Sequence, residues 1–186
     1  VMNQKGQIKQ KKIQIPVNNI SKYHLSNKSE MVTHLVMEHQ IGFTNLCISA
    51  QYALRELKLP KSKSSKHQVE DYYTEQLLRY SLFVDEPNLS IPSDKESSTF
   101  VTYFEKSYPK KNSFNLLRKI ELKTRLFKTR CSYMLGSSVF KALPADFKNT
   151  FMISLKEIVS QKNTELSFLG SHLEDDERER ILNVLS

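Results

Sequence analysis

Residues 29–58 read SEMVTHLVMEHQIGFTNLCISAQYALRELK, and this stretch decides the fold. Its apolar side chains recur every three to four positions, the spacing of one face of an α-helix. Ser26 or Ser29 is the expected N-cap, and Glu30 lies in the first turn, where a carboxylate complements the helix dipole. The helix should end before Pro60. The stripe consists of Leu35, Gly42, Phe43, Leu46, Ala50, Ala53 and Leu57. A helix of about 30 residues spans roughly 45 Å, so it is the expected spine of the domain.

Two further helices are predicted after a linker rich in lysine and serine at residues 61–66. The second helix carries a broad apolar face made of Val69, Tyr72, Tyr73, Leu77, Leu78 and Leu82. A loop at residues 85–92 follows, and Ser93 with Glu96 forms a capping box that opens a short helix. That helix carries Phe100, Phe104 and Tyr108 and should end at Pro109.

The C-terminal half continues the helical pattern. We predict a helical segment at 116–127 with an interruption near Ile120, a bend at 129–132, a short helix around 137–143 and a helix that Pro144 opens. The Pro144 helix carries Phe147, Phe151, Leu155, Ile158 and Val159. A last helix at 173–185 begins with four acidic residues, Glu174, Asp175, Asp176 and Glu177. The predicted class is all-α, an irregular bundle of about five to six helices around one long first helix.

Residues 1–25 differ from the rest of the chain. Scattered isoleucines and a valine stand among lysines and glutamines, too few to form a core alone, so an extended arm or edge strand is expected. Such an arm must lie on its own domain or on a partner. We therefore predict a basic arm at 1–25 and a helical domain at 26–186. An acidic protein partner would contact Lys9, Lys11 and Lys12.

Composition excludes several classes of protein. The 186 residues are 39% hydrophobic and 26% charged, as in a globular protein. Only four glycines are present, which disfavours β-sandwiches, barrels and glycine-rich nucleotide loops. No run of about 18 apolar residues predicts a membrane span. The net charge of +8 suits an anionic partner, although lysine used for solubility explains it equally simply.

The two cysteines, Cys47 and Cys131, stand outside any Cys-x-x-Cys-His motif, so covalent haem attachment to this chain is excluded. Two buried thiols and one disulfide both remain open. The serines at 132, 137 and 138 lack a Gly-x-Ser-x-Gly elbow and a recognisable base. No catalytic residue is therefore predicted, and we expect no activity from this chain by itself.

Polar chemistry is densest on the first helix. His34, Glu38 and Asn45 share one stripe, and a His-x-x-x-Glu pair such as His34 with Glu38 can hold a metal. His39 falls on the apolar stripe, where a buried, hydrogen-bonded histidine is the structural alternative to a ligand. Met37 could serve as an axial haem ligand or simply fill a gap in the core.

A run of basic residues near residue 125 contains two aromatic side chains, Phe127 and Tyr133, and is a candidate for nucleic-acid binding. Its members are Arg118, Lys119, Lys123, Arg125, Lys128 and Arg130. On a helix these charges would spread over several faces. Nucleic acid is therefore placed third among the expected partners.

Three stretches together resemble one family. They are Met37-Glu38-His39-Gln40 followed by Asn45; Leu122-Lys123-Thr124-Arg125-Leu126-Phe127-Lys128 followed by Cys131-Ser132-Tyr133; and Phe140-Lys141-Ala142-Leu143-Pro144 with Leu173-Glu174-Asp175-Asp176-Glu177-Arg178. Over residues 26–186 the chain resembles the C-terminal region of exported bacterial proteins often labelled cytochrome c-like. Arg130 stands where that family has a proline.

The resemblance implies a periplasmic or exported protein that is associated with a redox or haem-bearing module. Any covalently bound haem would then lie upstream of Val1, and a haem not attached to this chain is the expected cofactor. Glu38, His39, Asn45 and Met37 would form the site, with His39 nearest the cofactor. The leading hypothesis is a non-catalytic helical domain that packs on an upstream redox domain. The alternatives are an assembly subunit docked through its basic arm and a nucleic-acid-binding protein.

Overall fold

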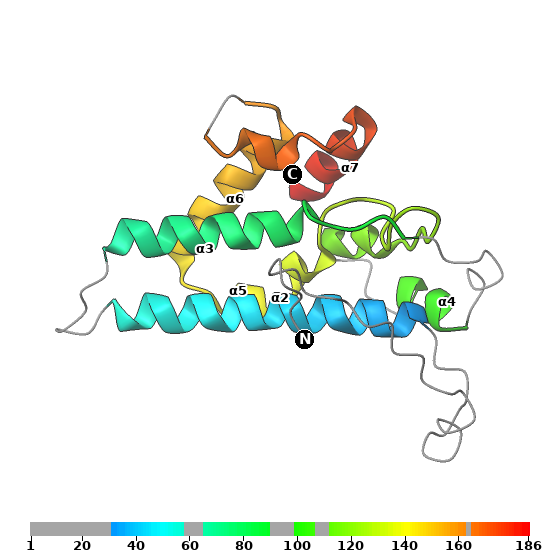
Figure 1. Cartoon of the computed structure of the whole chain (residues 1–186), viewed down its shortest axis with the longest axis horizontal. Helices are drawn as coiled ribbons and strands as arrows, with labels where there is room; N and C mark the ends of the chain where they lie inside the picture. Colours follow the sequence, from blue (N-terminus) through cyan, green and yellow to red (C-terminus); the bar gives the residue numbers. More distant parts are fainter. Residues whose placement is uncertain (1–30, 58–64, 90–98, 107–111, 163–164) are drawn as a thin grey trace, which may run out of the picture. The chain divides into compact units, whose positions relative to one another are not determined.

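The computed structural model describes residues 31–57, 65–89, 99–106, 112–162 and 165–186. The fold described is that of the second of two units, Val1–Met31 and Val32–Ser186. Within the described residues there are six α-helices, three 3₁₀-helices and no strand longer than an isolated bridge. The all-α prediction with a long first helix is confirmed (Figure 1).

Helix α2, Met31–Glu56, is the longest element and runs along the described helices as their spine (Figure 1). Its buried side consists of Val32, Val36, His39, Phe43, Cys47, Ala50 and Leu54. Leu35, Leu46 and Leu57, which the sequence predicted as members of the apolar stripe, are only partly buried and pack against this core. The prediction that His39 shares the apolar face is confirmed by its 6% exposure.

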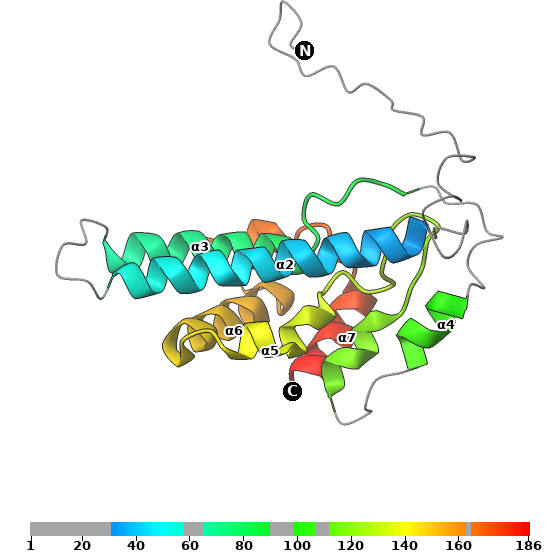
Figure 2. The same ribbon diagram turned by 90° about the horizontal axis from the view of Figure 1, so that it is seen from below.

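Helix α3, Lys66–Ser81, runs antiparallel to α2 and lies beside it in both views (Figures 1 and 2). Leu77 and Leu78 are fully buried, as predicted, whereas Tyr72 is 56% exposed and does not belong to the apolar face. The N–H groups of Phe83 and Val84 donate to the carbonyls of Tyr80 and Arg79 and close the last turn.

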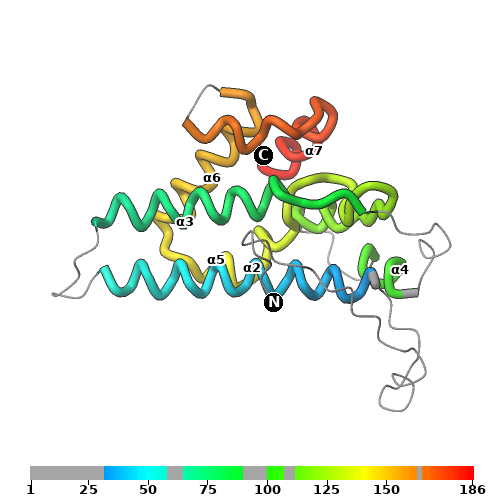
Figure 3. Tube along the Cα trace, viewed as in Figure 1, coloured from blue at the N-terminus to red at the C-terminus, as the bar shows by residue number. Residues whose placement is uncertain are grey.

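The remaining α-helices are α4 (Thr99–Lys106), α5 (Ser138–Lys141), α6 (Ala145–Val159) and α7 (Asp175–Leu185). The trace in Figure 3 shows α6 and α7 following one another at the C-terminal end of the domain. Helix α6 packs against α3 and α7, and all five predicted apolar residues of α6 are buried. Glu174 and Glu177 form a capping box at the start of α7, which explains the acidic residues there.

The predicted helical segment at 116–127 is wrong. A 3₁₀-helix, Ser113–Arg118, is followed by an extended turn in which Ile120 and Phe127 pair as an antiparallel bridge. Leu122 has a φ of 65° and is fully buried. The Glu121 carboxylate accepts hydrogen bonds from three successive backbone N–H groups, those of residues 123 to 125, and so satisfies donors that a helix would otherwise have used.

Several predictions lie outside the described residues: the arm at 1–25 with Lys9, Lys11 and Lys12, and the capping box of Ser93 and Glu96. Among the described helices, none combines the length and the apolar character that a membrane crossing requires. Two further 3₁₀-helices, Tyr133–Gly136 and Ser167–Gly170, connect the C-terminal elements.

Candidate functional site

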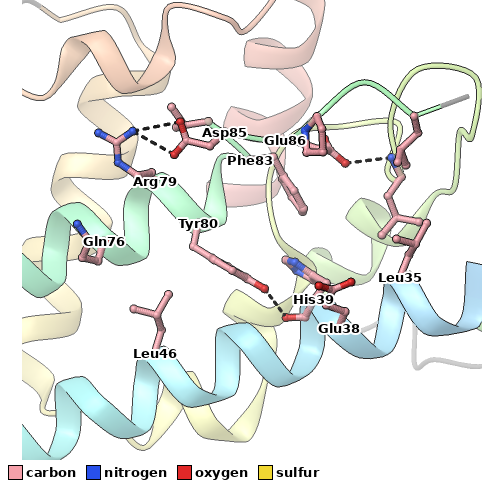
Figure 4. A pocket seen from close by; sticks show the side chains of 14 residues that line it. Leu35, Glu38, His39, Leu46, Gln76, Arg79, Tyr80, Phe83, Asp85 and Glu86 are labelled. Atoms are coloured by element: carbon pink, nitrogen blue, oxygen red, sulfur yellow. Dashed lines mark hydrogen bonds and ion pairs between the residues drawn. The ribbon is translucent and has the colours of Figure 1, made fainter. Parts of the chain in front are cut away.

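A pocket of about 490 Å³ lies between α2, the C-terminal half of α3 and the loop that follows α3 (Figure 4). Its apolar wall includes Leu35, Leu46, Tyr80, Phe83, Leu89 and Leu126. Charged side chains stand at its rim, and the imidazole of His39 is part of its wall. A largely apolar cavity of this size with a few polar groups is typical of small-molecule binding sites.

His39 lies inside a cluster of aromatic rings. Its imidazole stacks on Phe83 and Tyr80 with centroid distances of 4.8 and 5.3 Å, and the edge of Phe127 approaches at 5.5 Å. Tyr133 and Phe43 lie at 5.9 and 6.5 Å. Burial in this cluster lowers the pKa of His39 from 6.5 to about 4, so the ring is neutral at pH 7.

One ring nitrogen of His39 is held by the protein. Nε2 shares a hydrogen bond of 2.8 Å with Oγ of Ser132, which is fully buried. Ser132 Oγ also accepts a hydrogen bond from the N–H of Met134 at 3.1 Å. The other ring nitrogen, Nδ1, has no hydrogen bond to any described residue. Ser132 thus orients the imidazole, which is part of the pocket wall, and Nδ1 is left without a partner among the described residues.

Phe83 is placed against His39 by an unusual backbone conformation. It follows the C-cap of α3 with a φ of 54°, a position at which helices favour glycine. A phenylalanine in the left-handed region costs about 1 kcal/mol or more. The stacking of its ring on His39 gives a reason for keeping this residue there rather than glycine.

Tyr80 is fixed just as closely. Its hydroxyl donates a hydrogen bond to the carbonyl of His39 at 3.2 Å, which ties α3 to α2 at the pocket (Figure 4). The end of the Tyr80 side chain lies against Gly42. A Cβ atom at position 42 would come within 2.8 Å of Cζ of Tyr80, so a residue without a side chain suits this position. Burial raises the pKa of Tyr80, and the nearby charge of Glu38 adds to the effect. Tyr80 therefore stays protonated and acts as a donor.

Most charges at the rim are already satisfied. Arg79 donates to the carboxylates of Asp85 at 3.2 Å and Glu75 at 3.3 Å. Glu86 accepts from the N–H of Leu126 at 3.1 Å; burial raises its pKa, and this hydrogen bond partly offsets the rise. Glu38 is exposed and makes no hydrogen bond or ion pair with the described residues. The pocket therefore offers a largely apolar interior, with Arg79, Asp85 and Glu86 bonded at its rim and the exposed carboxylate of Glu38 beside it.

The four residues predicted to hold a cofactor do not meet at one site. His39 and Glu38 both line the pocket. Met37 is 50% exposed and Asn45 is exposed, and neither residue lines the pocket. Helical spacing placed the four on adjacent stripes, but the pocket reaches only the side of α2 that faces α3.

Few side chains in this region could coordinate iron or zinc. His34 and Glu38 both lie on the exposed side of α2, and no group of three metal-binding side chains occurs in the described ranges. A haem iron is commonly held by a free imidazole nitrogen or a thioether. Nε2 of His39 is bonded to Ser132, and Met37 lies outside the pocket, so the described residues offer one nitrogen, Nδ1 of His39, and no second axial ligand.

The pairing of Ser132 with His39 was not predicted from the sequence. The two residues are 93 positions apart, and no local motif connects them. A serine beside a histidine can be a nucleophile with its base. Ser132, however, is fully buried and does not line the pocket, so no substrate reaches its oxygen. The pair positions the imidazole instead.

The arginines of the basic run are used inside the protein. Arg118 is 7% exposed, and its guanidinium lies 4.1 Å from the ring centroid of Tyr133. Arg130 donates from Nε to Glu177 at 3.0 Å, and Arg125 lies 3.8 Å from the same carboxylate. Although burial alone would raise the pKa of Glu177, its hydrogen bonds with Arg130 hold it below the ordinary value. The members of the run exposed to solvent are Lys119, Lys123 and Lys128.

Both cysteines are free and buried. Burial raises the pKa of the Cys47 and Cys131 thiols to about 12. They are therefore inert thiols in the core rather than ligands or nucleophiles.

Comparisons with protein-family models, with curated proteins and with solved structures give no match for this chain. The pocket and the buried His39 are thus the features from which a function is argued.

Proposed function

We propose that this helical domain is a non-catalytic binding module whose pocket takes an uncharged, largely apolar group that carries one hydrogen-bonding atom. The observation that carries the proposal is the state of His39 at the pocket wall. The ring is neutral and fixed by Ser132, and its Nδ1 has no partner among the described residues. A single oriented polar group in an apolar cavity selects a ligand by one hydrogen bond.

The charge balance of the pocket favours an uncharged occupant. Arg79 and Asp85 neutralise each other at the rim, and Glu86 is bonded to a backbone N–H. A charged ligand would have to leave water for an interior whose wall is mostly apolar and whose uncharged polar side chains include His39 and Gln76, which is unfavourable. Aromatic and aliphatic groups, by contrast, would contact Tyr80, Phe83 and Leu46.

Binding is tested with N-phenyl-1-naphthylamine, an uncharged aromatic amine whose fluorescence rises in apolar sites. The native protein should bind it saturably with one probe per chain. Leu46→Trp places a larger side chain at the pocket wall and should weaken binding by about tenfold or more, since the space is lost. His39→Phe keeps the ring and removes the nitrogen, so it should weaken binding less.

Ile153→Trp is the matched control, because Ile153 is 59% exposed on α6 and does not line the pocket. This variant should bind the probe as the native protein does. Far-ultraviolet circular dichroism of each variant checks that the helices are intact. Equal binding by Leu46→Trp and Ile153→Trp, with both variants folded, would contradict a site in this pocket.

A second candidate function keeps the partner that the family resemblance implies, a redox or haem-bearing module. The observation that favours it is the neutral His39 with one open nitrogen at a pocket edged by aromatic rings. Such a ring could approach a cofactor carried by a partner. The visible absorption spectrum of the protein purified from its natural source tests this candidate. A haem band lost in His39→Phe supports it, and a spectrum without any haem band counts against it.

A further inference from the structure

The exposed side of α2 carries a second ordered stripe of side chains. Met37 and Ile41 are 50% and 56% exposed, and Ile48 and Tyr52 are 41% and 67% exposed. On most soluble helices this side is charged. Here the stripe carries charged residues only near its ends, Glu38 at one end and Arg55 at the other.

The stripe repeats with the spacing of a coiled coil. Its members are separated alternately by three and four positions and are all exposed: Glu38, Ile41, Asn45, Ile48, Tyr52 and Arg55. We call these six residues the outer stripe. Alternation of three and four is the heptad pattern in which one helix packs along another. From Ile41 to Arg55 the outer stripe lies away from the buried side of α2 and is not part of the domain's own core, whereas Glu38, its first member, also lines the pocket.

We propose that the outer stripe of α2 is an interface for a second copy of this chain, in which the two α2 helices pack antiparallel about a two-fold axis. In this register Glu38 meets the partner's Arg55, Ile41 meets the partner's Tyr52, and Asn45 meets the partner's Ile48. Each contact occurs twice, as two-fold symmetry requires.

Charge decides the direction of the pair. A parallel pair would place Glu38 beside the partner's Glu38 and Arg55 beside the partner's Arg55, and like charges at facing positions are unfavourable. The antiparallel pair instead places Glu38 beside the partner's Arg55 at both ends, where the exposed Glu56 next to Arg55 weakens this attraction. Asn45, near the middle of the stripe, faces the partner's Ile48 in this register, where an amide beside an apolar side chain costs some stability.

The length of the stripe sets the expected strength. From Glu38 to Arg55 the helix axis extends about 26 Å, at about 1.5 Å per residue. An interface of one helix pair is at the small end for stable dimers, so we expect dissociation in the micromolar range rather than below it. In Figures 1 and 2, α2 lies at an edge of the described helices, where a second copy could approach.

Sedimentation velocity of the full chain over a range of concentrations tests the proposal. The native protein should change from monomer to dimer as its concentration rises. Ile41→Glu should weaken the dimer by about tenfold or more, because a carboxylate replaces a buried apolar contact. Ile153→Glu is the control, since this equally exposed isoleucine lies on α6, and it should leave the dimer unchanged.

A charge exchange tests the antiparallel register. Glu38→Arg and Arg55→Glu should each weaken the dimer, and the double variant should restore it, because opposite charges meet again at both ends. All these positions are exposed, so the monomers should stay folded by circular dichroism. A native chain that remains monomeric throughout, a dimer indifferent to Ile41→Glu, or a double variant no tighter than the single ones would overturn the proposal.

Discussion

Replacement of His39 by phenylalanine should change how the stability of the domain depends on pH. In the folded protein the pKa of His39 is about 4, against 6.5 for an ordinary histidine. The unfolded chain therefore binds a proton between these values while the folded chain does not. Burial of neutral His39 contributes stability that is fully present above pH 6.5 and is lost as pH falls toward 4.

The size of this effect follows from the pKa difference. At about 1.4 kcal/mol per pKa unit, the drop from 6.5 to about 4 corresponds to about 3 kcal/mol. His39 is only 6% exposed, so solvent screening reduces the figure little. His39→Phe keeps the ring between Tyr80 and Phe83 but cannot take up a proton. Its stability should therefore fall less than that of the native protein between pH 7 and pH 4.

The assay is urea unfolding at a series of pH values, followed by circular dichroism because the chain contains no tryptophan. The quantity of interest is the difference in unfolding free energy between the two proteins. Other groups, including His172, whose pKa is lowered by burial, titrate in both proteins and cancel in the difference. A difference that stays constant from pH 7 to pH 4 would refute a buried, neutral His39.

Three other substitutions or reactions test separate parts of the structure. Glu177→Ala should destabilise the domain by about 3–5 kcal/mol in urea unfolding. The substitution leaves the charge of Arg130 without its buried partner and removes a capping contact of α7. A loss below about 1 kcal/mol would contradict this role. Gly42→Ala should lower the melting temperature, because the Cβ of alanine would collide with Tyr80, although alanine normally favours helices. A higher melting temperature of this variant would contradict the close contact between Gly42 and Tyr80. Cys47 and Cys131 should react with Ellman's reagent only after unfolding; rapid reaction of the native protein would mean that the thiols are exposed.

The sequence predicted the helices whose apolar spacing and ends agree. For α6, Pro144 stands at the N-cap and five apolar residues follow at helical spacing, so both position and buried face were predictable. The four acidic residues at the N-cap and in the first turn of α7 marked its start, because carboxylates are favourable at a helix N-terminus. The helix predicted at 116–127 failed because its apolar spacing also suits a tight turn. The decisive interaction there, the Glu121 carboxylate with three backbone N–H groups, has no periodic signal.

The candidate site was only partly predictable. His39 could be chosen because a histidine on an apolar stripe must be satisfied by some partner. Its partner, Ser132, comes from a segment 93 residues later and could not be found from spacing. Met37 and Asn45 were grouped with His39 because they are close along the helix, but the pocket opens only toward α3. The ring of Phe83 depends on a left-handed residue after α3, which no pattern indicated.

The proposed binding function depends most on His39 as a polar group of the pocket. Nitrogen-15 NMR of histidine-labelled protein at pH 7, titrated with N-phenyl-1-naphthylamine, observes this ring directly; the signal that disappears in His39→Phe identifies it among the five histidines. We predict a neutral imidazole whose Nδ1 signal shifts until one probe per chain is bound, while the signal of exposed His67 stays in place. A protonated His39, or a His39 signal unchanged when the probe is saturating, would contradict the account.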